Sequence, residues 1–206
     1  MYSFDQVLRS QVSNNLHRFD DRRHHDEQSR KAAVALTIIS HEGEAALILT
    51  KRSPKLKAHT GQWAIPGGRV DGNETAVDAA RRELVEEVGL AVNEDRVLGL
   101  LDDYSTRSGF TITPVVIWGG VQEDQLIANP EEVASIHPIT FAELTRTDAP
   151  NLESIPESDR QVLSMPFEDD RVYAPTAAML YQFREVALLG RNTRVSHYDQ
   201  PVFAWR

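Results

Sequence analysis

The sequence feature that most constrains the fold is a helix expected over residues 74–88, shortly after a Pro-Gly-Gly turn at 66–68. Asn73 or Thr75 can accept a hydrogen bond from the first helical turn, and Gly89 can end the helix in left-handed backbone. Both ends of the helix are therefore marked in the sequence. Any fold for this chain has to place the Pro-Gly-Gly turn close to the start of this helix.

Three carboxylates gather on one face of this expected helix. Glu83 and Glu87 are four residues apart and Glu86 is three residues from Glu83, so their side chains are neighbours. Such like-charged pairs destabilise a bare helix by ~0.2–0.5 kcal/mol each. Acidic runs on helices are usually solvated. A hard divalent cation also fits, since Mg²⁺ prefers a few carboxylates together with phosphate oxygens and water.

The composition is that of an ordinary soluble globular protein, with 206 residues of which 41% are hydrophobic and 26% charged. This length favours one domain with additions over two domains. No apolar run approaches the ~20 residues that cross a bilayer, and the first residues lack the features of a secretory signal. We therefore expect a cytoplasmic protein that does not engage membranes. The absence of cysteine excludes disulfides, thiolate nucleophiles and Cys-ligated zinc.

The net charge of −9 is unevenly distributed. Residues 120–170, here called the acidic segment, contain twelve acidic and two basic residues, whereas residues 51–69 contain five basic residues and no acidic one. An acidic protein is a poor general partner for nucleic acid. The basic stretch nevertheless suits an anionic small molecule, although a solvated loop would have the same composition.

The remaining sequence predicts both strands and helices, hence a mixed sheet in an α/β fold. Two apolar runs, 31–40 and 45–53, flank a polar turn with Gly43 and predict a β-hairpin. Further strands are expected at 62–65, 95–103, 110–118 and 132–138, and helical segments at 4–19, 141–145 and 176–190. We expect residues 20–31 to form a charged connector and residues 146–170 to form a long loop.

Residues 68–90 carry a spacing that resembles the full Nudix box. Gly68 is followed after five residues by Glu74, and after seven more by the run from Arg82 to Leu90, which holds Arg-Glu-Leu, Glu-Glu and Gly-Leu at the required places. The chain therefore resembles a Nudix hydrolase. The resemblance implies an α/β/α sandwich around a mixed β-sheet, with a loop–helix–loop that binds Mg²⁺ or Mn²⁺. It also implies hydrolysis of a nucleoside diphosphate linked to another group, X.

The resemblance also implies roles for the residues of the box. Glu83 and Glu87 match metal ligands, and Glu86 matches a further ligand or the base that activates water. The carbonyl group of Gly67 or Gly68 often completes the coordination shell. These residues form the expected metal site.

Other residues of the expected site brace the loop or supply an alternative base. Arg82 and Glu74 match residues that hold the loop through a salt bridge. Glu131 and Glu132 precede the strand expected at 132–138, a position that supplies the catalytic carboxylate in some Nudix enzymes. We take Glu132 as the candidate there, with a solvated surface acid as the alternative.

The stretch before the box resembles the coenzyme A pyrophosphatase branch of the family, through Leu-Thr-x-Arg-Ser at 49–53 and His-x-Gly-Gln at 59–62. We therefore expect the substrate to be coenzyme A or an acyl derivative, bound through Arg52, Lys57, His59, Gln62 and Gly67. His59 could equally pack within the loop.

Several alternatives remain open. The group X could instead belong to ADP-ribose, a dinucleotide or a damaged nucleoside triphosphate, and a Nudix fold can also bind a ligand without cleaving it. Tyr104 and Phe110 could stack an adenine or belong to the core.

We expect a domain organisation with a Nudix domain in the middle of the chain. Its parts are an N-terminal helix with its connector, the Nudix domain and a C-terminal tail, at 1–31, 32–190 and 191–206. The tail ends in the aromatic sequence PVFAWR, which suits a contact in a homodimer or a plug of the core.

Overall fold

The computed structural model describes residues 2–24, 28–56, 60–122 and 125–204. Lys57 and His59, which we expect to contact substrate, lie outside these described residues. Within the described ranges, a sheet of eight strands forms the centre of the molecule, with the order β3-β2-β1-β7-β5 along its main path. Strands β1 and β7 are parallel, and their other neighbours are antiparallel, so the sheet is mixed as expected.

The predicted hairpin is confirmed as β1 (Arg30–His41) and β2 (Glu44–Arg52), joined at Gly43. Both strands are buried almost throughout because helices cover both faces of the sheet. The remaining strands of the sheet are β3 (Trp63–Ala64), β4 (Gly67–Arg69), β5 (Val97–Leu100), β6 (Tyr104–Ser105), β7 (Phe110–Gln122) and β8 (Val133–Thr140).

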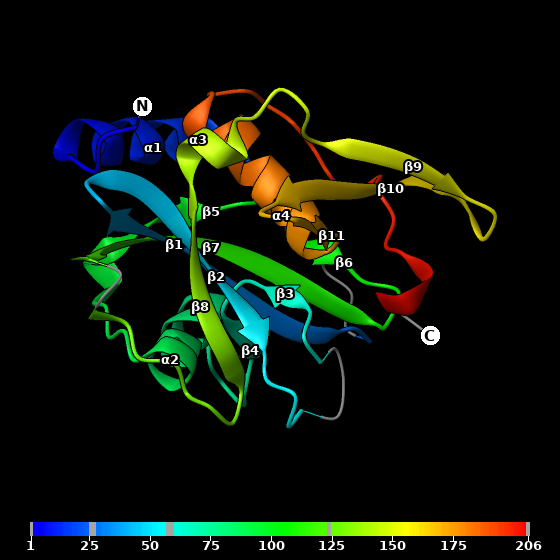
Figure 1. Cartoon of the computed structure of the whole chain (residues 1–206), viewed down its shortest axis with the longest axis horizontal. Helices are drawn as coiled ribbons and strands as arrows, with labels where there is room; N and C mark the ends of the chain where they lie inside the picture. The colour runs from blue at the N-terminus through cyan, green and yellow to red at the C-terminus, as the bar shows by residue number, and fades with distance from the viewer. Residues whose placement is uncertain (1, 25–27, 57–59, 123–124, 205–206) are drawn as a thin grey trace.

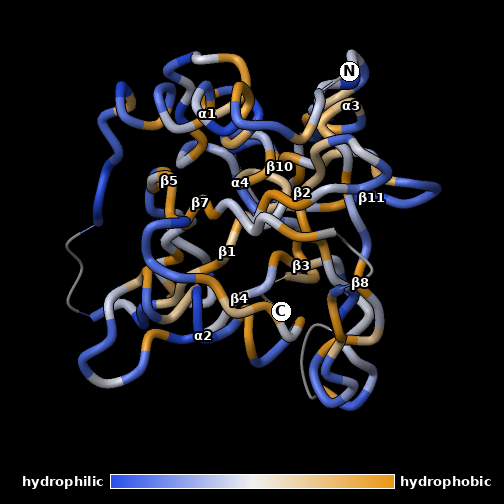
Figure 2. The backbone as a smooth tube through the Cα atoms, turned by 90° about the vertical axis from the view of Figure 1, so that its left-hand side faces the viewer, coloured by the Kyte–Doolittle hydropathy of each residue, from blue (hydrophilic) through white to orange (hydrophobic). Residues whose placement is uncertain are grey.

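Helices pack on both faces of the sheet, which confirms the predicted α/β/α sandwich. Figure 1 shows α2 (Ala76–Val88) on one side, and α1 (Gln6–Arg18), α3 (Phe141–Leu144) and α4 (Thr176–Phe183) on the other. The central strands are apolar and the outer loops largely polar (Figure 2). No helix in the described ranges has the length and apolar surface needed to cross a bilayer.

Helix α2 has the ends that the sequence predicts. Of the two candidate caps, Thr75 is the one used, because its hydroxyl accepts from the Asp78 amide while the Asp78 carboxylate accepts from the Thr75 amide. Gly89 ends the helix with a φ of 70°, which favours glycine over other residues. The helix is therefore fixed at both ends, and its inner face lies against β1 and β4.

The prediction of a long loop over residues 146–170 is wrong. Most of this segment belongs to a three-stranded antiparallel sheet of β9 (Asn151–Ile155), β10 (Ser158–Phe167) and β11 (Asp170–Tyr173). Its inner side chains, which include Leu163 and Met165, are buried in the main core, while its acidic residues face outward. A strand that buries only one face is expected to alternate apolar residues with exposed polar ones. The many acidic residues and the prolines of the segment make this alternation difficult to recognise in the sequence.

Two further expected elements differ at their ends. The second long helix leaves α-helical geometry at Phe183 and continues as a π-helical turn over Arg184–Leu188. The strand expected at 95–103 is shorter, because a 3₁₀ turn over Glu94–Arg96 precedes β5. Both changes leave the order of elements unaltered.

Both terminal segments are packed onto the domain. Leu8, Val12 and Leu16 of α1 are buried in the main core. The side-chain amides of Gln11 and Asn15 donate to the carbonyl groups of Leu188 and Ala187 at 3.0 and 2.9 Å, where the π-helical turn leaves acceptors unpaired. At the other end, Asp199 forms an isolated parallel bridge with Val162 of β10.

Candidate active site

The Gly-Gly turn packs closely between the sheet and α2. Strand β4 pairs with β1 so that Gly67 lies opposite Val34 and Gly68 opposite Ala33. A Cβ atom added to Gly67 would lie 2.4 Å from the carbonyl oxygen of Ala33, and one added to Gly68 would lie 2.0 Å from a carboxylate oxygen of Glu83. Glycine is therefore required at both positions, because any side chain would displace the strand or the carboxylate.

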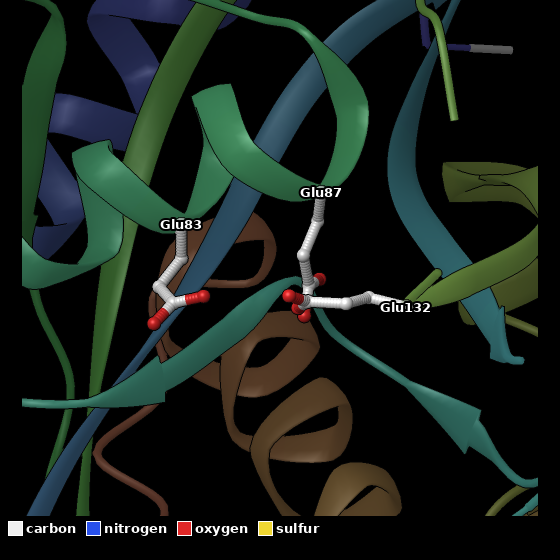
Figure 3. Close-up of side chains that lie close together, drawn as sticks. All are labelled: Glu83, Glu87 and Glu132. Carbon is white, nitrogen blue, oxygen red and sulfur yellow. The ribbon is translucent and has the colours of Figure 1, made fainter. Parts of the chain in front are cut away.

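Three carboxylates meet beside this turn. Glu83 and Glu87 extend from the inner face of α2, and Glu132 reaches them from the loop before β8 (Figure 3). One carboxylate oxygen from each lies within 4.8 Å of the others. We call these three residues the carboxylate cluster. Glu83 and Glu87 are only 8% and 4% exposed, so two of the three charges are largely removed from water.

Strand pairing brings Glu132 into the cluster from a distant part of the chain. Strands β2 and β8 pair antiparallel with Arg52 opposite Val133. The amide of Ser53 donates to the carbonyl oxygen of Glu132 at 2.9 Å, and its hydroxyl donates to that of Pro130 at 3.0 Å. These hydrogen bonds hold the loop beside the end of β2, and so place the Glu132 side chain next to α2.

The electrostatics of the carboxylate cluster fit a divalent cation. Burial raises the pKa of Glu87 to about 8, and the neighbouring charges of Glu83 and Glu132 act in the same direction. Arg52 and the Gly67 amide oppose this increase. Burial also raises the pKa of Glu83. Mg²⁺ and Mn²⁺ prefer several carboxylate oxygens close together, which is what this cluster offers. A bound cation would stabilise the ionised carboxylates and so lower their pKa values again.

The ion pair between Arg82 and Glu74, expected from the resemblance, is present with an Nε to Oε1 distance of 2.9 Å. Arg82 also donates to Glu83 and Glu86, both at 2.8 Å, and to the carbonyl oxygen of Arg69 at 2.9 Å. One guanidinium thus joins the helix to the glycine turn. This arrangement keeps the Glu83 carboxylate directed toward the turn.

Glu86 lies apart from the carboxylate cluster. Its side chain is 48% exposed, and its carboxylate accepts at 2.8 Å from Arg82 Nη1, the atom that also donates to Glu83. Glu131, the neighbour of Glu132, also points elsewhere, since it pairs with Lys55 at 2.5 Å. Of the candidate bases, the structure therefore brings only Glu132 to the inner face of α2.

A cavity of ≈ 480 Å³ opens next to the Gly-Gly turn. This volume lies within the range of small-molecule sites. Three of the residues expected to bind substrate, Arg52, Gln62 and Gly67, line it, as does Gly68. The cavity and the carboxylate cluster are therefore neighbours through Gly68, which lines the cavity and lies against Glu83.

Arg52, which lines the cavity, offers it a hydrogen-bond donor. Its Nε atom is buried and has no hydrogen-bond partner among the described residues. Buried donors in folded proteins are nearly always paired, and a guanidinium pairs best with a phosphate or carboxylate. Arg52 is thus suited to an anionic ligand.

The two aromatic residues suggested as adenine contacts lie in different places. Tyr104 is buried, and its hydroxyl donates to the carbonyl oxygen of Tyr198 at 3.1 Å, so it belongs to the core. Phe110 lines the cavity, with the guanidinium of Arg30 3.9 Å from its ring centroid. Tyr173 and Phe203 also line the cavity, and the sequence did not predict either of them as a site residue.

Nothing local marks these missed residues. Tyr173 lies in β11, just beyond the segment predicted as a loop, and Phe203 lies in the aromatic tail. The only signal was the aromatic sequence of the tail itself, which suggested a packing role without locating it.

The chain is similar to several known proteins. The model of the NUDIX domain matches residues 29–163. The uncharacterized Nudix hydrolase NudL of Pectobacterium atrosepticum is 36% identical, over 75% of this chain and 81% of its own length. NudL of Klebsiella pneumoniae is 38% identical over 59% of this chain, which spans 63% of that relative. A solved NUDIX hydrolase from Nitrosomonas europaea has a TM-score of 0.49 and 19% identity, and the match covers 81% of this chain and 76% of that one.

Proposed function

This chain belongs to the Nudix family of hydrolases, and on that premise we propose that it cleaves the pyrophosphate bond of coenzyme A or an acyl-coenzyme A. The products would be 3′,5′-ADP and a phosphopantetheine. The observation that carries the proposal is a carboxylate cluster that lies against Gly68, next to a cavity lined by Gly68 and by Arg52 with its unpaired Nε atom.

Glu83 and Glu87, with the carbonyl group of Gly67 or Gly68, are the residues that would hold Mg²⁺ or Mn²⁺. The bound ion would neutralise phosphate charge and acidify water. Arg52 donates from the cavity wall to a phosphate oxygen, which orients the diphosphate. The absence of side chains at the Gly-Gly turn lets the diphosphate approach the backbone closely.

Glu132 is the better placed of the two candidate bases. A carboxylate at the edge of the cluster can take a proton from the water that attacks phosphorus, because it reaches the same point as Glu83 and Glu87. The carboxylate of Glu86 is half exposed, accepts from Arg82 and does not belong to the cluster. We therefore assign the proton transfer to Glu132 and a supporting role in the Arg82 network to Glu86.

The choice of coenzyme A is supported by the charge of the cavity as well as by the sequence from Leu49 to Gln62. Besides Arg52, the cavity is lined by Arg69 and by Arg171, which also pairs with Glu153. Among the described residues, one acidic side chain, Asp170, lines it as well, so the lining carries an excess of positive charge. Coenzyme A carries a third phosphate in addition to its diphosphate, so it supplies more negative charge for these cations than ADP-ribose does. Much of the remaining wall is apolar and suits the pantetheine chain.

The test is a substrate panel of coenzyme A, acetyl-coenzyme A, ADP-ribose, NADH, diadenosine polyphosphates and 8-oxo-dGTP, with Mg²⁺ or Mn²⁺ and with products identified by mass. We expect 3′,5′-ADP and 4′-phosphopantetheine from coenzyme A, with the highest kcat/KM for the coenzyme A compounds. Preferential cleavage of ADP-ribose would overturn the substrate assignment. Cleavage of none of these compounds would overturn the proposed function.

A further inference from the structure

The C-terminal segment Tyr198–Ala204 passes beside the small sheet (Figure 1), and its residues Gln200, Phe203 and Ala204 line the cavity. Its start is fixed by the bridge between Asp199 and Val162 of β10, and by a hydrogen bond from the Asp199 amide to the carbonyl oxygen of Gln161 at 2.8 Å. The hydroxyl of Tyr104 in β6 donates to the carbonyl oxygen of Tyr198. The segment is therefore attached both to the small sheet and to the main one.

Arg107 strengthens this attachment. Its Nε atom donates to Asp199 Oδ1 at 2.8 Å, its Nη2 atom forms a second contact with the same carboxylate, and its amide donates to Gln200 Oε1 at 2.8 Å. Asp199 and Gln200 are buried. The backbone is thus held in place three residues before Phe203, so the position of that ring is set by the fold.

Phe203 presents an exposed aromatic ring at the cavity. It is 53% exposed although it is large and apolar, and its ring packs edge-on against Tyr173 with centroids 5.3 Å apart and an angle of 89° between the planes. Both rings line the cavity. Two rings at right angles form a corner that offers one face and one edge to a planar group. We call Tyr173 and Phe203 the aromatic corner.

We infer that the aromatic corner binds the nucleobase of the substrate, so that the C-terminal segment selects nucleotides; this rests on the proposed function. The diphosphate has to reach the carboxylate cluster beside Gly67 and Gly68, which fixes the middle of the ligand at the side of the cavity that these glycines line and leaves the nucleobase to extend along the cavity. The aromatic corner supplies planar surfaces that stack on any base. A flexible pantetheine chain gains nothing specific from two rings at right angles, whereas a purine does.

The direct test measures binding without catalysis, with AMP and ribose 5-phosphate as probes and isothermal titration calorimetry as the readout. These probes share the phosphate and the sugar and differ by the adenine. We expect the wild-type protein to bind AMP at least tenfold more tightly than ribose 5-phosphate, and Phe203→Ala to remove most of this difference. Phe203→Trp should restore it. Equal affinity of wild type and Phe203→Ala for AMP would overturn the inference.

A kinetic arm separates the nucleobase from the group X. Coenzyme A and ADP-ribose share the adenine and differ in X, so Phe203→Ala should raise the KM of each cleaved substrate about tenfold and change kcat less than twofold. If KM increases for only one of two cleaved substrates, the aromatic corner contacts the group X and not the shared adenine. This result would overturn the nucleobase assignment. Leu152→Ala is the matched control, because Leu152 is 41% exposed on β9 and does not line the cavity.

The binding arm also keeps this inference distinct from the proposed function. AMP binding can depend on Phe203 even if no pyrophosphate bond in the substrate panel is cleaved. Conversely, a protein that cleaves coenzyme A and binds AMP without regard to Phe203 would retain the proposed function and lose the inference.

Discussion

The acidic segment 120–170 and the carboxylate cluster are both rich in carboxylates, yet they differ in every respect that matters for function. In the acidic segment, Glu143 and Asp148 both pair with Arg146, at 2.6 and 2.7 Å, and Glu153 pairs with Arg171 at 2.8 Å. These side chains remain in contact with solvent. In the carboxylate cluster, burial is the main influence on the pKa values of Glu83 and Glu87, and it raises both. The nearby arginines, Arg82 and Arg52, offset this increase only in part.

The difference shows that local charge density by itself does not identify a site. Exposed ion pairs stabilise a protein little, because water already solvates both partners. Carboxylates that burial and mutual repulsion keep from ionising are costly unless a ligand compensates. Glu132 demonstrates the point, since it belongs to the acidic segment by sequence and to the carboxylate cluster by position.

The largest effect is expected when the cluster loses a charge. Glu87→Gln should lower kcat at least ~100-fold, because the site loses a ligand for the cation while the shape of the side chain is kept. Without metal, the same variant should melt no lower than the wild type, since it removes a buried and repelled carboxylate. Steady-state kinetics and calorimetry test both statements. Activity above a tenth of the wild-type value would contradict the role of Glu87 as a ligand.

A second effect is expected from pH in the absence of metal. Glu87 has a pKa of about 8 in the folded protein against an ordinary value of 4.5. Between pH 4.5 and pH 8, its carboxyl group is therefore protonated in the folded state and ionised in the unfolded state. This contribution to stability is complete below pH 4.5 and is lost as the pH rises through 8. We expect the Tm of the metal-free protein to fall by several degrees between pH 6 and 9.

The controls for this pH effect are Mg²⁺ and the Glu87→Gln variant. Saturating Mg²⁺ should raise Tm most at the alkaline end, because the cation compensates the ionised cluster. The variant should show a flatter dependence on pH in EDTA. An equal fall of Tm in wild type and variant would assign the effect to other groups.

The smallest effect is expected in the acidic segment. Asp148→Asn removes the charge of an exposed carboxylate that pairs with Arg146 and touches neither the cluster nor the cavity. Solvent and the remaining partner of Arg146, Glu143, compensate the loss. We expect kcat/KM to stay unchanged and Tm to remain within about 2 °C. A loss of activity comparable to that of Glu87→Gln would remove the distinction between the two acidic regions.

The parts of the structure that the sequence predicts are those determined by near neighbours. The caps of α2, the hairpin at Gly43 and the shared face of Glu83 and Glu87 follow from spacings of a few residues, and all are observed. The ion pair between Arg82 and Glu74 follows from the box. Local spacing captures these features because helix and strand periodicities act over the same short distances.

Features that depend on distant pairing were not predictable in this way. Glu132 was one of two adjacent candidates, and only the register of β2 with β8 places it beside α2 while Glu131 turns to Lys55. The cavity joins Phe110 to Tyr173 and Phe203, and no spacing in the sequence relates these residues. The small sheet was missed because its buried side chains are hidden among exposed acids and prolines.

The position of the C-terminal segment also determines how the protein can be joined to other molecules. Ala204 lines the cavity, whereas α1 packs at the opposite end of the sandwich (Figure 1). A fusion partner or an affinity tag that continues the chain beyond Ala204 would therefore begin beside the cavity and could obstruct the entrance of substrate. The same tag linked before α1 would leave that entrance open, so a comparison of the two fusions measures access to the cavity without altering any residue of the native sequence.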